Sequence, residues 1–556
     1  MNYLELLNLD TGNLTRSAEA AGLIGKRLGD QASELSGMAD VPPAVWDGDD
    51  ATAAVDTLRE RVPPLEDVSQ AMLYARVVLI DLAEQLQIAK DALIAAKSEA
   101  ERTPPLSVDA QTGMVVIPPG LPKEQEDALR PFASRVSAQI TMAVINANNA
   151  DFHATQALEG MSRPGAQLPM SEPASMPGKD WTPQQITDWW NGLTEEERRH
   201  LLENEAPFVA DTDGIPTVFR DLANRELLGD QIDQTRTEIA GLKEDKGDLL
   251  GGPGSQGDRR ALDDQINAAE DKLAALEGLQ NRINENGAAI YNDDGTYERS
   301  YLMDFNPEGD GQAVVAVGNP DTADNVVTMV PGMGSELSGV PGDLGRVERM
   351  VAAANTLDPT QETAGILWQG YDAPDGVHNA FSSSYAENGA PALGRFMSGL
   401  EAVQGGPDAA RNTLLGHSYG STVVGHAATA EGGVATDQMV FAGSPGVAAD
   451  HASELGVGAD NVYATSATND IINAVPDYPW THNASPVDQE FGAHVFDTPH
   501  DGGPISPFAA HSGYWDNETT LHSFAKIITG NGEHVPEVVH APNNSPGLPW
   551  FLDPYN

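Results

Sequence analysis

From about Gly287 to the end of the chain, short apolar runs alternate with segments of helical periodicity, and this alternation most constrains the fold. Helices are expected over 343–356, 391–403 and 422–431. The runs between them include GQAVVAVG, NVVTMVPGMGS, TAGILWQGYDAP, RNTLLGHSYGS, TDQMVFAGSPG, DNVYATSATND and EFGAHVFDTP. Such alternation predicts a mostly parallel sheet with helices on both faces. In such sheets the functional residues gather in loops at the carboxyl ends of the strands.

The preceding half of the chain has no such alternation and is predicted to be all-helical. The first helix is expected from Thr11 or Asn13 towards Met38, followed by a loop over 39–62. Two further helices are expected, one with apolar residues at helical spacing through 72–93 and one from 123 to about 158.

Residues 226–286 have the clearest periodicity. Mostly apolar residues step alternately by three and four on either side of the sequence GGPGSQG, which no helix would cross. The expected seam residues are Leu228, Ile232, Thr235, Ile239, Leu242, Lys246 and Leu249 before it and Leu262, Ile266, Ala269, Leu273, Leu276, Gln280 and Ile283 after it. This pattern predicts an antiparallel helical hairpin with coiled-coil-like packing, serving as an arm or a dimerisation element. The predicted organisation is a helical domain at 1–160, a Pro/Ser-rich linker at 161–180, a helical segment at 181–225, the hairpin at 226–286 and the α/β domain at 287–556.

Composition excludes several classes of function. The net charge of −52 repels nucleic acid and anionic lipid, so no nucleic-acid partner is expected. The chain has no cysteine, which excludes disulfides and thiolate metal sites, and no His-Glu-x-x-His spacing, so neither metal nor cofactor is predicted. No window approaches the ~18 apolar residues of a membrane span, and the N-terminus lacks the pattern of a secretory signal. We expect a cytoplasmic protein, or one exported without a cleavable signal peptide.

Ser418 is the candidate nucleophile. It lies in the sequence Gly416-His417-Ser418-Tyr419-Gly420, between the apolar run NTLL and the small-residue helix pattern STVVGHAATA. A G-x-S-x-G turn from strand to helix exposes the serine hydroxyl, and small flanking residues let the strand and the helix approach closely. The pentapeptide alone is a weak signal, but the strand–turn–helix setting strengthens it.

A serine nucleophile needs a base that is oriented by a carboxylate, and after such a turn the acid and then the base follow along the chain. Asp470 is the candidate acid because it follows the strand-like run NVYATSATND, and Asp477 is the alternative. His511 in FAAHSGYWD is the candidate base. His494, His500 and His522 are competitors, whereas His417 and His426 are too close to Ser418 in sequence.

Two backbone N–H groups are needed to bind the oxyanion of an acyl-transfer intermediate. Tyr419, the residue after the serine, is expected to supply the first. The loop in VVTMVPGMGSELSG is expected to supply the second, from Met333 between the close-approach residues Gly332 and Gly334.

Residues about 300 to 530 resemble an actinobacterial α/β-hydrolase family of uncharacterised function. The resemblance is carried by VPGMGS, WQGYDAP, GHSYGS, FAGSPG, FGAHVFDT and HSGYW in this order, and 189–228 resembles the segment that precedes the hydrolase domain in such proteins. It implies a Ser418–Asp470–His511 triad and an N-terminal helical region. The expected function is hydrolysis of a small ester or lipid-like substrate through an acyl-enzyme, with acyl transfer or peptide cleavage as further options.

An alternative function is suggested by Trp46-Asp47-Gly48 in the first loop. A helix, a W-x-G turn and a second helix resemble the helical hairpins exported by type VII secretion systems. A buried tryptophan beside a turn glycine explains the same residues without export. In the export hypothesis the helical regions mediate a homodimer or a contact with a secretion partner, and the hydrolase domain is cargo or inactive. The loop from Val475 to His511 is long enough to be a lid.

Overall fold

The structure is a computed structural model that describes residues 1–39, 49–161, 172–248, 255–287, 300–467, 470, 472, 482–499 and 507–538. These residues form two compact units. The first contains Met1–Glu172 with Thr194–His200, and the second contains Pro173–Leu193 with Leu201–Asn556. The W-x-G turn, Asp477, His500 and much of the predicted lid lie outside the described residues.

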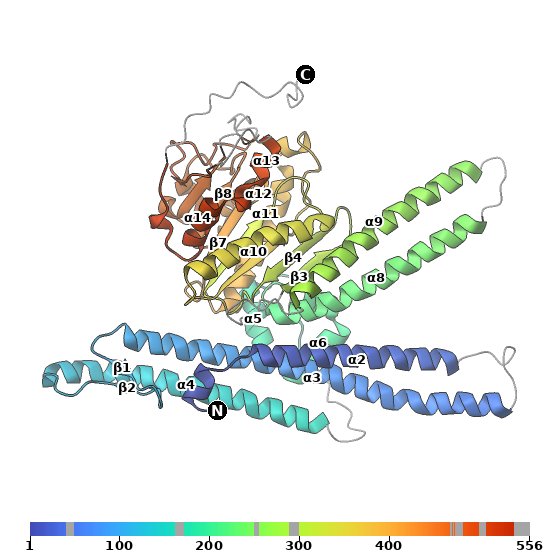
Figure 1. Cartoon of the computed structure of the whole chain (residues 1–556), viewed down its shortest axis with the longest axis horizontal. Helices are drawn as coiled ribbons and strands as arrows, with labels where there is room; N and C mark the ends of the chain where they lie inside the picture. The colour runs from blue at the N-terminus through green and yellow to red at the C-terminus, as the bar shows by residue number, and fades with distance from the viewer. Residues whose placement is uncertain are drawn as a thin grey trace. The chain divides into compact units, whose positions relative to one another are not determined.

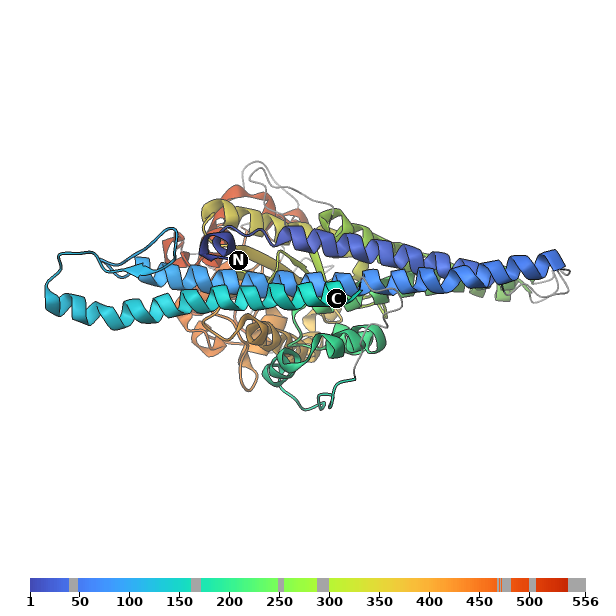
Figure 2. The same cartoon turned by 90° about the horizontal axis from the view of Figure 1, so that it is seen from below.

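The first unit is built on long helices, as the periodicity predicts. Helices α2 (Gly12–Ala39) and α4 (Lys123–Met161) both pack against α3 (Asp49–Glu101), and the three run side by side in Figures 1 and 2. The short elements are α1 (Tyr3–Leu7) and the antiparallel pair β1 (Ser107–Val108) and β2 (Val115–Val116).

The expected loop over 39–62 is wrong from Asp49 onward, because α3 begins there and continues through Pro63 and Pro64. The first turns of α3 consist largely of Ala, Asp, Leu, Arg and Glu. Most of these residues have high helix propensity, so α3 begins before the segment with periodic apolar residues.

The second unit contains an eight-stranded sheet in the order β10-β9-β8-β7-β5-β6-β4-β3. Strands β5 to β10 are parallel, whereas β4 pairs antiparallel with both β3 and β6. The predicted mostly parallel sheet is therefore confirmed. The strands are β3 (Ser300–Asn306), β4 (Gln312–Val317), β5 (Asn325–Val330), β6 (Thr363–Gln369), β7 (Arg411–His417), β8 (Gln438–Ala442), β9 (Val462–Thr465) and β10 (His494–Val495).

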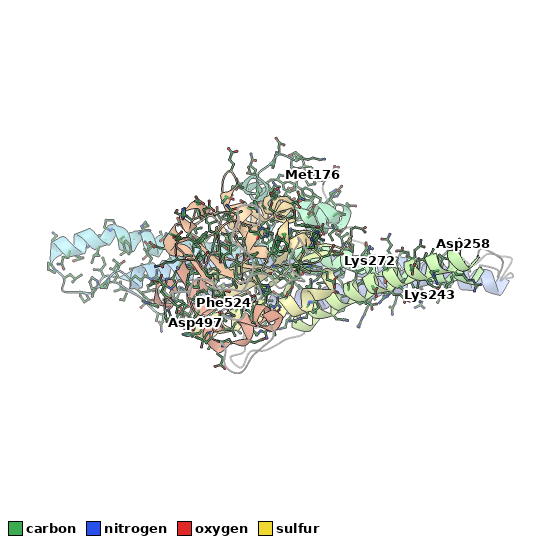
Figure 3. All side chains as sticks on the ribbon, turned by 90° about the horizontal axis from the view of Figure 1, so that it is seen from above. Met176, Lys243, Asp258, Lys272, Asp497 and Phe524 are labelled. Carbon is green, nitrogen blue, oxygen red and sulfur yellow. The ribbon has the colours of Figure 1, made fainter. Side chains whose placement is uncertain are left out.

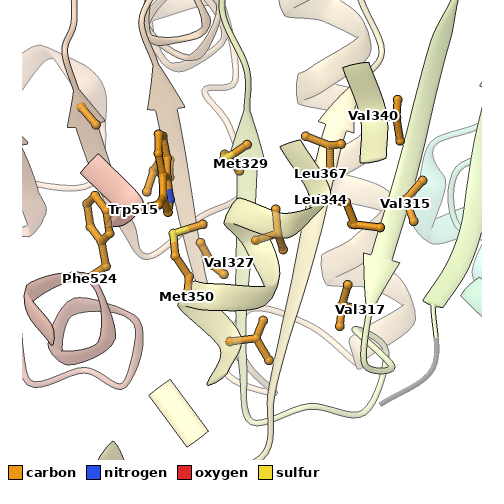
Figure 4. Packing of buried hydrophobic residues seen from close by; sticks show 14 of the residues in the cluster. Val315, Val317, Val327, Met329, Val340, Leu344, Met350, Leu367, Trp515 and Phe524 are labelled. Atoms are coloured by element: carbon orange, nitrogen blue, oxygen red, sulfur yellow. The ribbon is translucent and has the colours of Figure 1, made fainter. Parts of the chain in front are cut away.

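Helices cover both faces of this sheet. On one face α10 (Val340–Leu357) and α14 (Glu518–Ile528) contribute Met350 and Phe524 to the core cluster that contains Val327 and Met329 of β5 (Figure 4). Because successive strand residues alternate between faces, the intervening Thr328 points to the other side. There α11 (Ser384–Gln404) and α12 (Gly420–Thr429) pack on one another.

The predicted helical hairpin is formed by α8 (Thr217–Asp248) and α9 (Ser255–Gly287). Figure 3 shows Lys243 and Lys272 along its two helices. Its base is not a separate module: apolar residues at this end belong to the same core cluster as the sheet. These residues are Leu228, Ile232, Leu276, Leu279 and Ile283. At the base of the hairpin Leu279 is buried, whereas the expected seam residue Gln280 is only half-buried. The buried position there follows Leu276 by three residues rather than by the expected four.

The segment at 181–225 consists mainly of helices. It contains α5 (Pro183–Gly192), α6 (Glu195–Asn204), α7 (Ala206–Asp211) and the start of α8. Thr194 begins α6 with reciprocal contacts: its backbone N–H donates to Glu197, whose own N–H donates to the Thr194 hydroxyl. Trp190 is buried, and its half-buried neighbour Trp189 packs edge-on against the rings of Trp190 and Phe208.

Candidate active site

Ser418 lies on a sharp turn between β7 and α12. Its φ of +53° is in the left-handed region, which costs a non-glycine residue on the order of 1 kcal/mol or more. Its backbone N–H donates to the carbonyl of Ala442 at 3.0 Å, which ties the turn to the end of β8. The surrounding sheet therefore holds this serine in a conformation that it would not adopt alone.

Two glycines make the turn sterically feasible. A Cβ on Gly416 would lie 2.5 Å from the Cα of Ser421, on the helix that follows. A Cβ on Gly420 would lie 2.2 Å from the carbonyl oxygen of Val330, on the neighbouring strand. Since backbone atoms cannot yield at these distances, both positions require glycine.

The structure brings Ser418, His511 and Asp470 together in one chain of hydrogen bonds. His511, on the short helix α13 (Pro507–Ser512), places its Nε2 2.7 Å from the Ser418 Oγ. Its Nδ1 lies 2.7 Å from Oδ1 of Asp470, which follows β9. The Asp470 side chain is fully buried, whereas 16% of the His511 side chain is exposed. The imidazole is thus held by a buried carboxylate and faces the serine.

The Asp470 carboxylate has further donors. The backbone N–H of Ile472 donates to Oδ1 at 2.8 Å, and the hydroxyl of Tyr514 donates to Oδ2. The Tyr514 oxygen in turn accepts the backbone N–H of Ala467 at 3.1 Å. Tyr514 is part of the HSGYW sequence, but the sequence alone did not indicate a function for it. Its position three residues after His511, on the next turn, is the signal that could have indicated it.

Of the other candidates from the sequence, the structure describes His494 and His522, and neither contacts Ser418. His494 lies on β10, where its Nε2 is 2.9 Å from the carbonyl oxygen of Val535. His522 is exposed on α14. Asp477 and His500 lie outside the described residues.

His417 is a buried neighbour of the site. Its Nε2 lies 2.9 Å from the carbonyl oxygen of His511, and its ring packs edge-on against Trp515. Burial, and then the nearby His511, hold the pKa of His417 well below its usual value. A neutral His417 donates from Nε2 to that carbonyl and supports the backbone that carries His511.

The expected oxyanion donors flank the serine. A Cβ on Gly332 would lie 2.6 Å from the Ser418 Cβ, so the loop after β5 passes directly against the candidate nucleophile. Among the described residues, no backbone carbonyl or side chain accepts a hydrogen bond from the backbone N–H groups of Met333 and Tyr419. The Met333 side chain is 38% exposed.

This loop is held in place by two contacts from the segment after β6. The hydroxyl of Tyr371 donates to the carbonyl of Pro331 at 2.8 Å, and Gly334, at a φ of +73°, donates its N–H to the carbonyl of Pro374 at 2.9 Å. Burial raises the pKa of Tyr371 well above its usual value, so its hydroxyl stays a donor. The loop that contains Met333 is therefore braced on both sides.

Tyr419 is fixed by its side chain as well as by the turn. Its buried hydroxyl donates to the carbonyl of Ser382 and accepts the N–H of Ala386 at 3.3 Å. Burial raises the pKa of Tyr419 to about 12. These bonds join the residue after the serine to the start of α11.

The described residues contain no group of three or more His, Cys, Asp or Glu side chains arranged to hold a metal ion. In the same residues, every helix is too short or too polar to cross a membrane.

Comparisons with known proteins agree with this fold. A family model described as "Alpha/beta hydrolase" matches residues 306–479, a range that includes Ser418 and Asp470 but ends before His511. Together with the sheet and its helices, this match identifies the C-terminal region as an α/β-hydrolase domain that follows a helical N-terminal region. The predicted fold class is confirmed, and the match supports a hydrolase.

Curated relatives of the chain are mycobacterial. Uncharacterized protein Rv2079 of Mycobacterium tuberculosis (strain ATCC 25618 / H37Rv) is 26% identical over 526 residues, or 87% of this chain and 77% of that protein. Uncharacterized protein Rv0963c of the same strain is 34% identical over 174 residues, or 30% of this chain and 64% of that protein. Uncharacterized protein Mb0988c of Mycobacterium bovis shares the same identity and coverage. No solved structure matches the chain significantly.

Proposed function

We propose that the α/β-hydrolase domain is a serine hydrolase that acts on carboxylic esters through a Ser418–His511–Asp470 triad. The observation that carries this proposal is the pair of 2.7 Å contacts from the Ser418 Oγ to His511 and from His511 to Asp470. The same relay of hydroxyl, imidazole and carboxylate activates serine in unrelated hydrolases.

In the first step the Ser418 Oγ attacks the ester carbonyl carbon while its proton passes to the His511 Nε2. Asp470 keeps the imidazole in the tautomer with its proton on Nδ1 and stabilises the imidazolium that forms. The new oxyanion accepts hydrogen bonds from the backbone N–H groups of Tyr419 and Met333, which are unused within the described residues.

Collapse of this intermediate breaks the bond to the leaving alkoxide, which takes the proton from His511 and departs as an alcohol. The acyl group stays on the Ser418 oxygen. A water molecule then gives its proton to His511 and attacks the acyl carbon, and the second intermediate releases the carboxylic acid and restores the serine hydroxyl. If a second alcohol replaced water here, the same residues would transfer the acyl group.

An ester is proposed over a peptide because an alkoxide leaves a tetrahedral intermediate more readily than an amine anion does. A small ester or lipid-like substrate is therefore the proposed class. The export hypothesis depends on Trp46 and Gly48, which lie outside the described residues. It remains a prediction, as do the localisation and the homodimer.

A fluorophosphonate probe tests the proposal, because it reacts with activated serines. We expect the wild type to be labelled and Ser418→Ala and His511→Ala to be unlabelled. Ser398→Ala is the matched control: this serine is exposed on α11, where its hydroxyl donates to the carbonyl of Gly394, and its removal should leave labelling intact. A series of p-nitrophenyl esters of increasing acyl length would then define the substrate. Absence of labelling in the folded wild type would refute the proposal.

A further inference from the structure

Tyr514 lies directly behind the candidate triad. It begins the short 3₁₀ helix Tyr514–Asp516 that follows α13, and its side chain is fully buried. Its hydroxyl donates to Oδ2 of Asp470, the carboxylate oxygen that His511 does not contact. Its buried ring thus approaches the carboxylate from the side away from the imidazole.

The direction of this hydrogen bond is set by a neighbouring backbone group. The N–H of Ala467 donates to the Tyr514 oxygen at 3.1 Å, so this oxygen already acts as an acceptor and its proton is free for Asp470. Burial, and then the charge of Asp470, raise the pKa of Tyr514 well above its usual value. The phenol therefore keeps its proton and remains a donor.

The two carboxylate oxygens of Asp470 have separate partners. Oδ1 accepts from the Ile472 N–H at 2.8 Å and from the His511 Nδ1 at 2.7 Å, whereas Oδ2 accepts from Tyr514. Without the Tyr514 hydroxyl, Oδ2 would have no side-chain or backbone donor among the described residues. The carboxylate could then rotate and weaken its bond to His511.

A glycine leaves room for this contact. Gly443, at a φ of +57°, follows β8, and a Cβ there would lie 2.9 Å from both Oδ2 of Asp470 and the Tyr514 oxygen. Any side chain at this position would push the two oxygens apart. The glycine at position 443 therefore permits the close approach of the Tyr514 hydroxyl to the Asp470 carboxylate.

We propose that Tyr514 is a positioning residue of the triad, whose hydroxyl fixes the Asp470 carboxylate so that Oδ1 stays on the His511 Nδ1. The inference rests on the proposed function of Ser418, His511 and Asp470. Tyr514 touches no reacting atom and acts through Asp470 alone.

The test compares the rate constants of fluorophosphonate labelling of wild type, Tyr514→Phe, Asp470→Asn and the double variant. Phenylalanine keeps the ring and removes only the hydroxyl. Since a hydrogen bond to a charged group is typically worth a factor of ten or more, we expect Tyr514→Phe to slow labelling about tenfold. In the Asp470→Asn background the same change should slow labelling by less than about threefold, because the carboxylate through which it acts is gone.

Tyr463→Phe is the matched control. Tyr463 is a buried tyrosine on β9, and its hydroxyl lies beside Gly532 rather than beside the triad. This variant should label within about twofold of the wild type, and thermal unfolding of all variants checks that each is folded.

The outcomes separate this inference from the proposed function. If the wild type is not labelled, the proposed function fails and the inference fails with it. If the wild type is labelled but Tyr514→Phe labels at the same rate, the inference alone is overturned. It is also overturned if Tyr463→Phe is slowed equally, or if Tyr514→Phe costs as much in Asp470→Asn as in the wild type, since either result would indicate a general packing effect.

Discussion

The turn at Ser418 and the α8–α9 hairpin use glycine in opposite ways, although both belong to one compact unit. At the turn, a Cβ on Gly332 or Gly420 would lie within 2.6 Å of another residue's atoms. In the hairpin, a Cβ on Gly241 or Gly278 would meet nothing within 4 Å. An added side chain would therefore clash with neighbouring atoms at the turn but would extend into open space at these two positions of the hairpin.

The difference reflects what holds each region. The hairpin is held by an apolar seam and by surface ion pairs such as Arg236–Glu277 at 2.8 Å and Lys243–Glu270 at 2.7 Å. Such pairs contribute little individually and tolerate change. The turn depends on contacts at fixed distances, so single substitutions there should have large effects and substitutions in the hairpin small ones.

The largest effect is expected for Asp470→Asn. The amide can donate to the His511 Nδ1 and stabilise the tautomer that cannot accept the serine proton, so kcat should fall about 10⁴-fold, as in other serine triads. Steady-state hydrolysis of a p-nitrophenyl ester measures this. Asp516→Asn, at an aspartate whose side chain is 70% exposed, is the control and should retain wild-type kcat. A loss of less than about tenfold would indicate that Asp470 is not the acid.

The second-largest effect is expected on the pH dependence of stability, through Asp321 at the start of the hairpin. Asp321 accepts hydrogen bonds from the backbone N–H of Thr217 at 2.7 Å and from its hydroxyl at 2.6 Å, at the first residue of α8. Burial raises the pKa of Asp321 from its ordinary value of 3.8 to about 6. The folded state therefore binds this proton more tightly than the unfolded state does.

Because the folded pKa is raised, stability from this group is greatest below pH 3.8 and is lost as the pH rises through 6. The shift corresponds to about 3 kcal/mol between pH 4 and pH 7. Urea unfolding of Asp321→Asn across this range should lack that part of the pH dependence. If the wild type and Asp321→Asn have parallel pH profiles, Asp321 does not titrate in this window.

A smaller effect is expected for Gly332→Ala. The added Cβ would lie 2.6 Å from the Ser418 Cβ and 3.0 Å from its Oγ, so the serine must shift. A displacement on the order of 1 Å typically costs about 10²-fold in rate, so kcat for a p-nitrophenyl ester should fall by about that factor. Gly339→Ala, at a position where a Cβ meets nothing within 4 Å, is the matched control. Unchanged kcat in Gly332→Ala would show that the loop after β5 does not crowd the nucleophile in solution.

The smallest effect is expected in the hairpin. Gly241 is exposed within α8, so Gly241→Ala should stabilise the protein by roughly 0.5–1 kcal/mol through helix propensity, with no change in kcat. Denaturant unfolding and the ester assay measure both quantities. Destabilisation, or a change in kcat, would mean that the hairpin is as tightly constrained as the turn.

The sequence predicted the elements well where a local pattern determines them. The strand–helix alternation gave the mostly parallel sheet, and the small residues around Ser418 indicated the sharp turn. The structure also brings together Ser418, Asp470 and His511, the three residues selected from chain order. Their catalytic roles remain proposals.

Contacts between residues far apart in the chain were harder to predict from the sequence. The shift from Gln280 to Leu279 at the base of the hairpin follows from contact with the sheet, which periodicity within one helix cannot reveal. The contact of Tyr514 with Asp470 joins residues 44 positions apart, and the only sequence signal for it is that Tyr514 follows His511 by three residues. The antiparallel β3–β4 pair was not anticipated, because no helix separates these two strands and the strand–helix alternation that predicts parallel strands does not extend to them.

The most direct test of the central claim is to locate the covalent adduct. The wild type would be reacted with a fluorophosphonate, digested, and analysed by mass spectrometry for the modified peptide. The account predicts a single adduct, on the Oγ of Ser418. An adduct on another residue, or none in the folded protein, would contradict it.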